Sequence, residues 1–260
     1  MLFRLAGLVV LWGTIIFTVK QENEIVWAIS AVCSLVIMHF MSKWLKLGGL
    51  PGIGLRMKKG WHRFLIYGCF IGIVYQTLRF CVMYGTGTFN LHSLPVEPIS
   101  LIISTVILLV STAYIGFAEE IVFRGYLINL FPSLSAYAAV GSAALFTLGH
   151  LIDGNVDVFR ISFLFLAGLF FAICYIVTRS LWFVAGIHWF WDFAWFYLGA
   201  DGGTSSAKIV DVTIRDEMRS FYEWMDPAMA FCLLLLLLVL SRKNFNVQQS
   251  RNIHHAHRND

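Results

Sequence analysis

Two carboxylates and a guanidinium lie at the end of a long apolar run. The run ISLIISTVILLVSTAYIGFA carries no charge, and AEEIVFRGYL, which overlaps its end, contains Glu119, Glu120 and Arg124. In a helix, Glu120 and Arg124 are i,i+4 neighbours that can pair, while Glu119 is rotated away by about 100°. A carboxylate that stays unpaired in such surroundings can take a proton from water and return it later. Glu119 is therefore a candidate general base; alternatively, all three residues form a charge-neutralising cluster that fixes helix packing.

Two further stretches supply imidazoles. In FTLGH, Phe146 and His150 are i,i+4 neighbours, so the phenyl ring can cover and orient the imidazole. In HWFWD, His188 and Asp192 share one helical face, and a carboxylate bonded to one ring nitrogen fixes the tautomer that the other nitrogen presents. A single histidine inside an apolar helix is usually a packing residue. The coincidence of acidic and imidazole side chains on nearby helices instead indicates a site that activates water.

These side chains support two mechanisms of water activation. In the first, Glu119 activates water against a peptide carbonyl, and His150 positions the water. His188 and Asp192 then stabilise the developing oxyanion. In the second, His150, His188 and a carboxylate bind zinc, whose bound water is the nucleophile. The sequence contains no HExxH motif, so we expect the metal-free mechanism and keep zinc as the alternative. The candidate catalytic residues are Glu119, Glu120, Arg124, His150, His188 and Asp192.

The composition indicates that these residues lie within a membrane. The 260 residues are 58% hydrophobic and only 13% charged, which departs from soluble proteins in the direction of membrane proteins. The apolar runs predict an all-α polytopic membrane protein with about eight transmembrane helices that enclose an intramembrane cavity. The expected spans are 3–19, 25–41, 63–83, 98–117 with a continuation to about 130, 135–152, 160–178, 180–199 and 227–241.

The basic residues predict the orientation of the chain. If the N-terminus is cytoplasmic, the cytoplasmic segments carry 12 Lys and Arg residues and the opposite side carries 5, so we expect both termini in the cytoplasm. The segment 42–60 lacks a phosphate-loop motif, and its basic residues are expected to face anionic lipid headgroups. The basic residues form no aromatic-interleaved patch, so nucleic acid is not an expected partner. We expect a single integral membrane domain over 1–260, with a catalytic core over about 105–200 and a basic cytoplasmic tail over 242–260.

The order of the three motifs resembles a known group of intramembrane proteases. EEIVFR at 119–124, FTLGH at 146–150 and HWFWD at 188–192 follow the patterns EExxxR, FxxxH and HxxxN/D. These patterns are typical of the CPBP group, which includes CAAX prenyl endopeptidases and bacteriocin-processing enzymes often labelled Abi. The resemblance implies a multi-span helical fold enclosing a membrane cavity, and cleavage of a peptide near the membrane surface.

The resemblance also implies roles for individual residues. Glu119 is implied as the base, His150 and His188 as catalytic residues, and Asp192 occupies the Asn/Asp position. The prenyl-processing branch carries Asn there, and Asp cannot donate a hydrogen bond to an oxyanion unless it is protonated. The group also bears a metalloprotease label, so the resemblance leaves the metal requirement open.

The expected function is that of an intramembrane endopeptidase acting on a small membrane-associated peptide or protein, such as a CAAX-type tail, a leader or a propeptide. One alternative is a non-catalytic bacteriocin immunity or scaffold membrane protein. Another is a small transporter whose path is lined by Arg79, Glu120 and Asp192, although the sequence shows no inverted repeats.

The expected topology contains a conflict of depth. Glu119 should lie toward the cytoplasmic side, and His150 toward the other. As one helix, the run 98–130 would be about 50 Å long, against a hydrocarbon core of about 30 Å. We therefore expect a tilt or kink that brings Glu119 to mid-membrane.

Overall fold

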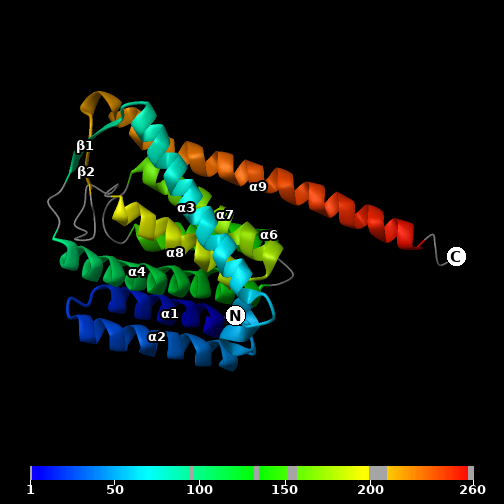
Figure 1. The fold of residues 1–260 in the computed structure, drawn as a ribbon. Helices are drawn as coiled ribbons and strands as arrows, with labels where there is room; N and C mark the ends of the chain where they lie inside the picture. Colours follow the sequence, from blue (N-terminus) through cyan, green and yellow to red (C-terminus); the bar gives the residue numbers. More distant parts are fainter. Residues whose placement is uncertain (1, 94–96, 132–134, 152–156, 199–209, 257–260) are drawn as a thin grey trace.

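Helices that follow the apolar runs of the sequence make up most of the chain, as Figure 1 shows for the computed structural model. The structure describes residues 2–93, 97–131, 135–151, 157–198 and 210–256. The long helices are α1 (Leu2–Val19), α2 (Glu24–Trp44), α3 (Trp61–Gly85), α4 (Pro98–Glu120), α6 (Ser135–His150), α7 (Val158–Thr178), α8 (Leu181–Tyr197) and α9 (Arg219–Ala256). Each predicted span corresponds to one of these helices. The helix α9 begins at Arg219, before its expected start at 227.

Among the described residues, five helical stretches are long and apolar enough to cross a bilayer: α2, α3, the continuous run Pro98–Leu130, α7 and Asp216–Leu240. Their outward faces are apolar; on α4, for example, Ile99 and Ile102 are 67% and 64% exposed. Such a surface would be unfavourable in water and is favourable against lipid tails. The protein is therefore an all-α, multi-pass integral membrane protein.

The helix that carries the acidic motif continues beyond Glu120. α4 continues without a break into η2, a π-helical segment over Ile121–Tyr126, and then into α5 (Leu127–Leu130). Glu119 and Glu120 therefore lie in the interior of a 33-residue helix. The π-helical segment begins directly after the two carboxylates. Such segments are rare, and they occur frequently at functional sites.

Glycines allow α3 and α8 to pack with their backbones close together. Gly68 and Gly72 form a GxxxG pair on α3. A Cβ atom at these positions would lie 2.2 Å from the Phe183 carbonyl oxygen and 2.5 Å from the Ile187 carbonyl oxygen. Small residues at this spacing are the usual device by which membrane helices approach each other. α4 packs on α8 through Gly116 in the same way, so α8 is fixed between α3 and α4.

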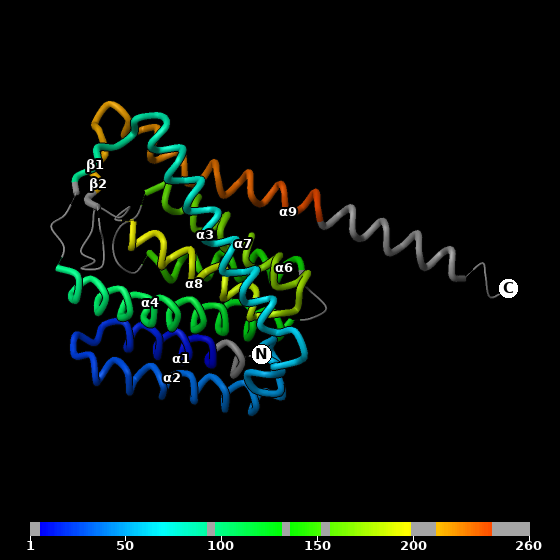
Figure 2. Tube along the Cα trace, viewed as in Figure 1, coloured from blue at the N-terminus to red at the C-terminus, as the bar shows by residue number. Residues whose placement is uncertain are grey.

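The remaining elements lie around this centre. α1 and α2 pack against each other and α1 lies along α4, as the Cα trace in Figure 2 shows. α7 contacts α6, α8 and α9. The connection between α2 and α3 contains a second π-helical turn, η1 (Pro51–Leu55), in which Gly54 has a φ of 118°.

A two-stranded antiparallel sheet joins two connections that are distant in the sequence. β1 (Phe89–Ser93) follows α3, and β2 (Val210–Ile214) precedes α9. Phe89 pairs with Ile214, and the strand pairing continues to Ser93 opposite Val210. Met83 and Met225 form a small hydrophobic cluster with Phe89 of β1 and Val212 of β2. The sequence analysis did not predict these strands.

Candidate active site

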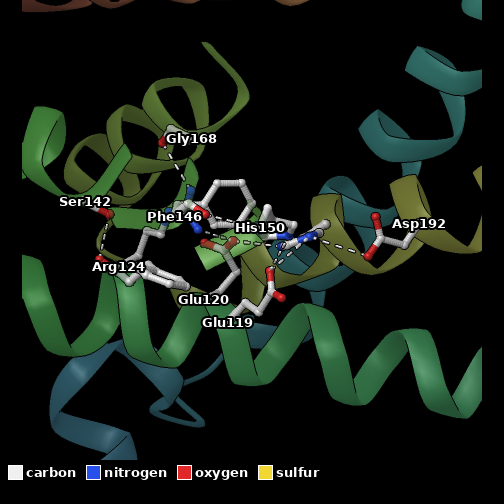
Figure 3. A network of polar contacts seen from close by, with 10 residues as sticks. Glu119, Glu120, Arg124, Ser142, Phe146, His150, Gly168 and Asp192 are labelled. Carbon is white, nitrogen blue, oxygen red and sulfur yellow. Dashed lines mark hydrogen bonds and ion pairs between the residues drawn. The ribbon is translucent and has the colours of Figure 1, made fainter. Parts of the chain in front are cut away.

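The three motifs converge on one cluster, which Figure 3 shows. Glu119 and Glu120 come from the end of α4, and Arg124 comes from η2. His150 is the last residue of α6. His188 and Asp192 lie in α8. All six sequence-predicted residues are therefore brought together, and the cluster lies where α4, η2, α6 and α8 meet.

Glu119 faces both imidazoles. Its Oε2 atom lies 3.8 Å from His150 Nε2 and 3.8 Å from His188 Nε2. The residue is only 5% exposed, and Oε2 has no direct hydrogen-bond partner in the described part of the chain. One carboxylate oxygen is thus equidistant from two ring nitrogens. The sequence analysis expected the rings and the carboxylate to meet, and the structure places them together.

Glu120 is the centre of a second, tighter set of contacts. Its Oε1 atom accepts a hydrogen bond from Arg124 Nη1 at 2.8 Å and another from His188 Nδ1 at 2.9 Å. Glu120 and Arg124 are both fully buried. Arg124 also donates to the Gly168 carbonyl oxygen through Nη2 at 3.2 Å, and its guanidinium carbon lies 4.5 Å from the centre of the Phe146 ring. The buried cation is therefore held by one carboxylate, one carbonyl and an aromatic face.

The hydrogen bonds define how the two histidines are oriented. His150 Nδ1 lies 2.9 Å from the Phe146 carbonyl oxygen. A carbonyl can only accept, so we assign the proton to Nδ1, which leaves the lone pair of Nε2 facing Glu119 in the neutral ring. The Phe146 ring centre is 4.4 Å from the imidazole. The i,i+4 spacing predicted this ring contact from the sequence.

His188 is oriented by Glu120 rather than by Asp192. Its Nδ1 donates to Glu120, whereas Asp192 Oδ2 lies 3.5 Å from its Nε2. Phe171 stacks on the imidazole with a ring separation of 5.0 Å and an interplanar angle of 21°. The sequence analysis had assigned the orienting role to Asp192, which lies on the same helical face as His188. The structure corrects this: the orienting carboxylate comes from α4, and Asp192 is adjacent to the nitrogen that faces Glu119.

A pocket of about 360 Å³ opens beside these groups. Glu119, His150, His188 and Asp192 line it together with apolar and aromatic side chains from α4, α6, α7 and α8. A smaller pocket of about 250 Å³ adjoins it, because Phe163, Leu164 and Trp195 line both. The ionisable groups therefore lie in an accessible hollow with mainly apolar walls, the usual form of a ligand site.

The geometry does not support the zinc alternative. A catalytic zinc site needs three protein ligands directed at one point about 2 Å from each. Among the described residues, no group of three or more His, Cys, Asp or Glu side chains has an arrangement that could hold a metal ion.

Arg79 lies outside this cluster. Its Nε atom is 2.6 Å from Asp226 Oδ1, and its guanidinium carbon lies 4.0 Å from the centre of the Trp195 ring. Glu120 is fully buried against Arg124 and His188 and does not line the pocket. Of the three residues expected to line a transporter path, Asp192 lines this pocket, whereas Arg79 and Glu120 are not among its lining residues.

Comparison with protein families agrees with the order of the motifs. Residues 101–194 match the model of the family described as Type II CAAX prenyl endopeptidase Rce1-like. The chain carries an Rce1-like domain. The matched segment begins in α4 and ends in α8, so it includes η2 and every residue of the cluster. The resemblance to the CPBP group is thereby confirmed for this segment. Searches of curated proteins and of solved structures found no match.

Three contacts of the Rce1-like domain escaped the sequence analysis. Phe171 stacks on His188, and the Gly168 carbonyl accepts from Arg124; both lie in α7, which carries none of the three motifs. An aromatic residue inside an apolar helix gives no signal that separates it from ordinary core. The contact between Glu120 and His188 joins residues 68 positions apart, and helical spacing predicts only neighbours within one helix.

Proposed function

We propose that this protein is an intramembrane endopeptidase in which Glu119 activates a water molecule against a peptide carbonyl. The observation that carries the proposal is the position of Glu119 Oε2, which lies 3.8 Å from Nε2 of both histidines at the edge of the pocket. This separation is longer than a direct hydrogen bond, and it suits one bridging water about 2.8 Å from the carboxylate and from a ring nitrogen.

The first step forms a bond between the water oxygen and the carbonyl carbon of the peptide. The water donates one hydrogen bond to Glu119 and the other to the lone pair of His150 Nε2, so that its own lone pair is directed at the substrate. As the bond forms, Glu119 takes one proton from the water. His150 holds the second hydrogen in place and fixes the direction of attack.

The tetrahedral intermediate carries its negative charge on the former carbonyl oxygen. In the imidazolium form, His188 bears a proton on Nε2 as well as on Nδ1 and can donate it as a hydrogen bond to this oxygen. Glu119 then returns its proton to the amide nitrogen, and the carbon–nitrogen bond breaks. The products are a carboxylic acid and an amine, which together account for the atoms of the peptide and one water.

Asp192 is the group that assists His188 at the oxyanion. It lines the pocket, and its Oδ2 is 3.5 Å from His188 Nε2. As a carboxylate, Asp192 stabilises the imidazolium by its charge; as a carboxylic acid, it also donates a hydrogen bond to the oxyanion. The carboxylate form therefore acts through the charge of His188, and the acid form acts on the oxyanion directly.

Glu120 and Arg124 are positioning residues, because neither lines the pocket. Glu120 holds His188 through Nδ1, and Arg124 holds Glu120. The pair thus fixes the ring nitrogen that faces the substrate. The two adjacent carboxylates therefore have separate roles: Glu119 accepts the proton of water, and Glu120 orients His188.

The proposal includes the arrangement in the membrane. Eight helices, α1 to α4 and α6 to α9, cross the bilayer around an intramembrane cavity, and both termini lie on the cytoplasmic side. One domain spans 1–260, its catalytic core is about 105–200, and 242–260 is a basic tail. The excess of basic residues in the segments assigned to the cytoplasm supports this orientation.

The substrate is proposed to be the tail, leader or propeptide of a small membrane-associated polypeptide. The description of the matched family names a prenyl endopeptidase of CAAX sequences, and the mainly apolar walls of the pocket suit a peptide with an apolar group. The adjoining 250 Å³ pocket extends this space and can take the chain on one side of the scissile bond.

Peptide cleavage by purified protein tests the proposal. Full-length protein in nanodiscs is incubated with a quenched fluorescent peptide that ends in a prenylated cysteine and three further residues, and with the same peptide lacking the prenyl group. Glu119→Gln should lower kcat/KM by about 10²- to 10⁴-fold. Glu24→Gln, which makes the same change at an exposed position, should leave it unchanged.

A second measurement covers substrates unlike these probes. Membranes from cells that produce the wild type or Glu119→Gln are compared for new peptide N-termini by mass spectrometry. N-termini specific to the wild type support an endopeptidase. If wild type and variant cleave equally, or if neither generates a new N-terminus while both still protect cells from a bacteriocin, the non-catalytic alternative replaces the proposal.

A further inference from the structure

A separate basic pocket lies at the N-terminal end of α8. Its volume is about 470 Å³, and it forms where the connection between α2 and α3 meets the end of α7. Four cationic residues line it: Arg56, Lys58, Lys59 and Arg179. No acidic residue is among the described residues of its wall, and within the described chain none of these four side chains forms a salt bridge. The pocket therefore concentrates uncompensated positive charge.

Two helix N-termini add to this charge. α3 begins at Trp61 and α8 at Leu181, and both beginnings lie in the wall of the pocket. Their cap residues, Gly60 and Ser180, make no side-chain hydrogen bond to the first turn. In the first turn of α3, the N–H groups of Trp61 and Arg63 donate to the Lys58 and Gly60 carbonyl oxygens. The positive ends of the two helix dipoles nevertheless favour an anion.

An unpaired donor lies in the same wall. The Nε1 atom of Trp182 is buried and has no hydrogen-bond partner among the described residues. A buried indole N–H normally has an acceptor. Trp182 also packs against Trp61, with ring centres 4.3 Å apart. Cations, helix N-termini and this donor all favour the same kind of ligand, which is an anion with several acceptor oxygens.

The surroundings favour a ligand that belongs to a lipid. Tryptophan rings are typical of the level at which headgroups meet the apolar core of a bilayer. Phe64, one turn after Trp61 and also in the wall, is 42% exposed. The pocket is thus polar on the side of the basic loop and apolar along α3, which matches a headgroup followed by acyl chains. We infer that this pocket binds the phosphate group of an anionic phospholipid.

The floor of the pocket contacts the helix that carries the active site. The Tyr175 hydroxyl donates to the Ile53 carbonyl oxygen at 2.7 Å, and the Asn129 amide donates to the Tyr175 hydroxyl. Asn129 lies in α5, the continuation of η2. A Cβ atom at Gly125 of η2 would lie within 3 Å of both Ile53 and Leu181. A bound headgroup therefore braces the segment that positions Glu120 and Arg124.

The test is a binding measurement on the full chain that does not depend on peptidase activity. Detergent-solubilised protein is titrated with a short-chain phosphatidylglycerol, with phosphatidylcholine of the same acyl length and with inorganic phosphate, and thermal unfolding is followed. Phosphatidylglycerol should stabilise the protein saturably with one site. Phosphatidylcholine should stabilise it much less.

Matched variants distinguish a defined site from diffuse surface charge. Lys58→Gln combined with Lys59→Gln should weaken phosphatidylglycerol binding by about fivefold for each charge removed. Lys43→Gln combined with Arg63→Gln removes two charges from the helix ends that flank this connection, outside the pocket, and should change binding less than twofold. Trp182→Phe keeps an aromatic ring, removes the N–H donor, and should also weaken binding.

The outcomes separate the possibilities. Equal weakening by both double variants overturns the site in favour of non-specific attraction to a basic surface. Unchanged binding in the pocket variants overturns it as well. If inorganic phosphate binds as tightly as phosphatidylglycerol, in a manner that the pocket variants abolish, the lipid assignment is overturned in favour of a soluble phosphate.

Discussion

Glu120→Gln is expected to destabilise the protein because it leaves Arg124 as a buried cation without its counter-ion. Both side chains are fully buried, and the atoms of the ion pair are 2.8 Å apart. Removal of one partner from a buried pair costs roughly 3 to 5 kcal/mol, whereas replacing both charges by uncharged groups is often neutral. Arg124 keeps its hydrogen bond to Gly168 and its contact with Phe146. We therefore expect the lower end of this range, about 3 kcal/mol off the free energy of unfolding.

Adding Arg124→Met to Glu120→Gln should restore most of this stability. The second change removes the cation, while the glutamine carbonyl can still accept a hydrogen bond from His188 Nδ1. Activity should not return with stability, because the charged partner of His188 is still missing. We expect kcat per folded molecule to stay lower than in the wild type by about tenfold or more, as for other groups that orient a catalytic histidine.

The assay combines reversible unfolding with peptide cleavage on the same preparations. Unfolding in mixed micelles is followed by circular dichroism for the wild type, both single variants and the double variant, which completes a double-mutant cycle. If the double variant unfolds as easily as Glu120→Gln alone, the uncompensated charge is not the cause. If it regains both stability and kcat, the negative charge of Glu120 is not needed at His188.

Three further predictions concern the pocket, helix packing and metal. Asp192→Asn should retain kcat within about tenfold, because an amide can donate a hydrogen bond to the oxyanion. Asp192→Ala should lower kcat by at least 10²-fold. Equal kcat values for the two variants in the cleavage assay would contradict a role of Asp192 at the oxyanion. Gly72→Leu should lower the unfolding free energy by more than about 2 kcal/mol, because its side chain would overlap α8. The control is Gly13→Leu on α1, where a Cβ meets no atom within 4 Å. A similar loss of unfolding free energy in both variants would refute the packing argument. Protein that has been treated with a chelator, and shown by metal analysis to be free of metal, should cleave the peptide at an unchanged rate. If activity is lost and zinc alone restores it, a zinc mechanism replaces the glutamate mechanism.

The order and approximate positions of the helices could be predicted from the sequence because the signal is local. A run of about twenty apolar residues predicts a helix whatever surrounds it. The i,i+4 rule likewise predicted the pairing of Glu120 with Arg124 and the contact of Phe146 with His150. These contacts lie within single helices, so no knowledge of helix packing was needed.

The contacts between helices could not be predicted in the same way. The hydrogen bond from His188 to Glu120 depends on how α8 rotates against α4, and glycine contacts such as that at Gly116 set that rotation. The π-helical segment was also missed, because no residue in IVFRGY distinguishes a π-turn from an α-turn. The β1–β2 pairing joins residues that are more than a hundred positions apart, and each strand is only five residues long.

The small sheet has a consequence for how the chain assembles. β1 is synthesised directly after α3, but its partner β2 emerges only after α4, α6, α7 and α8. Contacts of such long sequence separation form late, because the intervening chain must first be ordered. During synthesis the edge of β1 therefore has no β2 to pair with, and the strand pairing closes only when the last helix follows. The sheet thus connects the chain after α3, which is synthesised early, to the chain before α9, which is synthesised last.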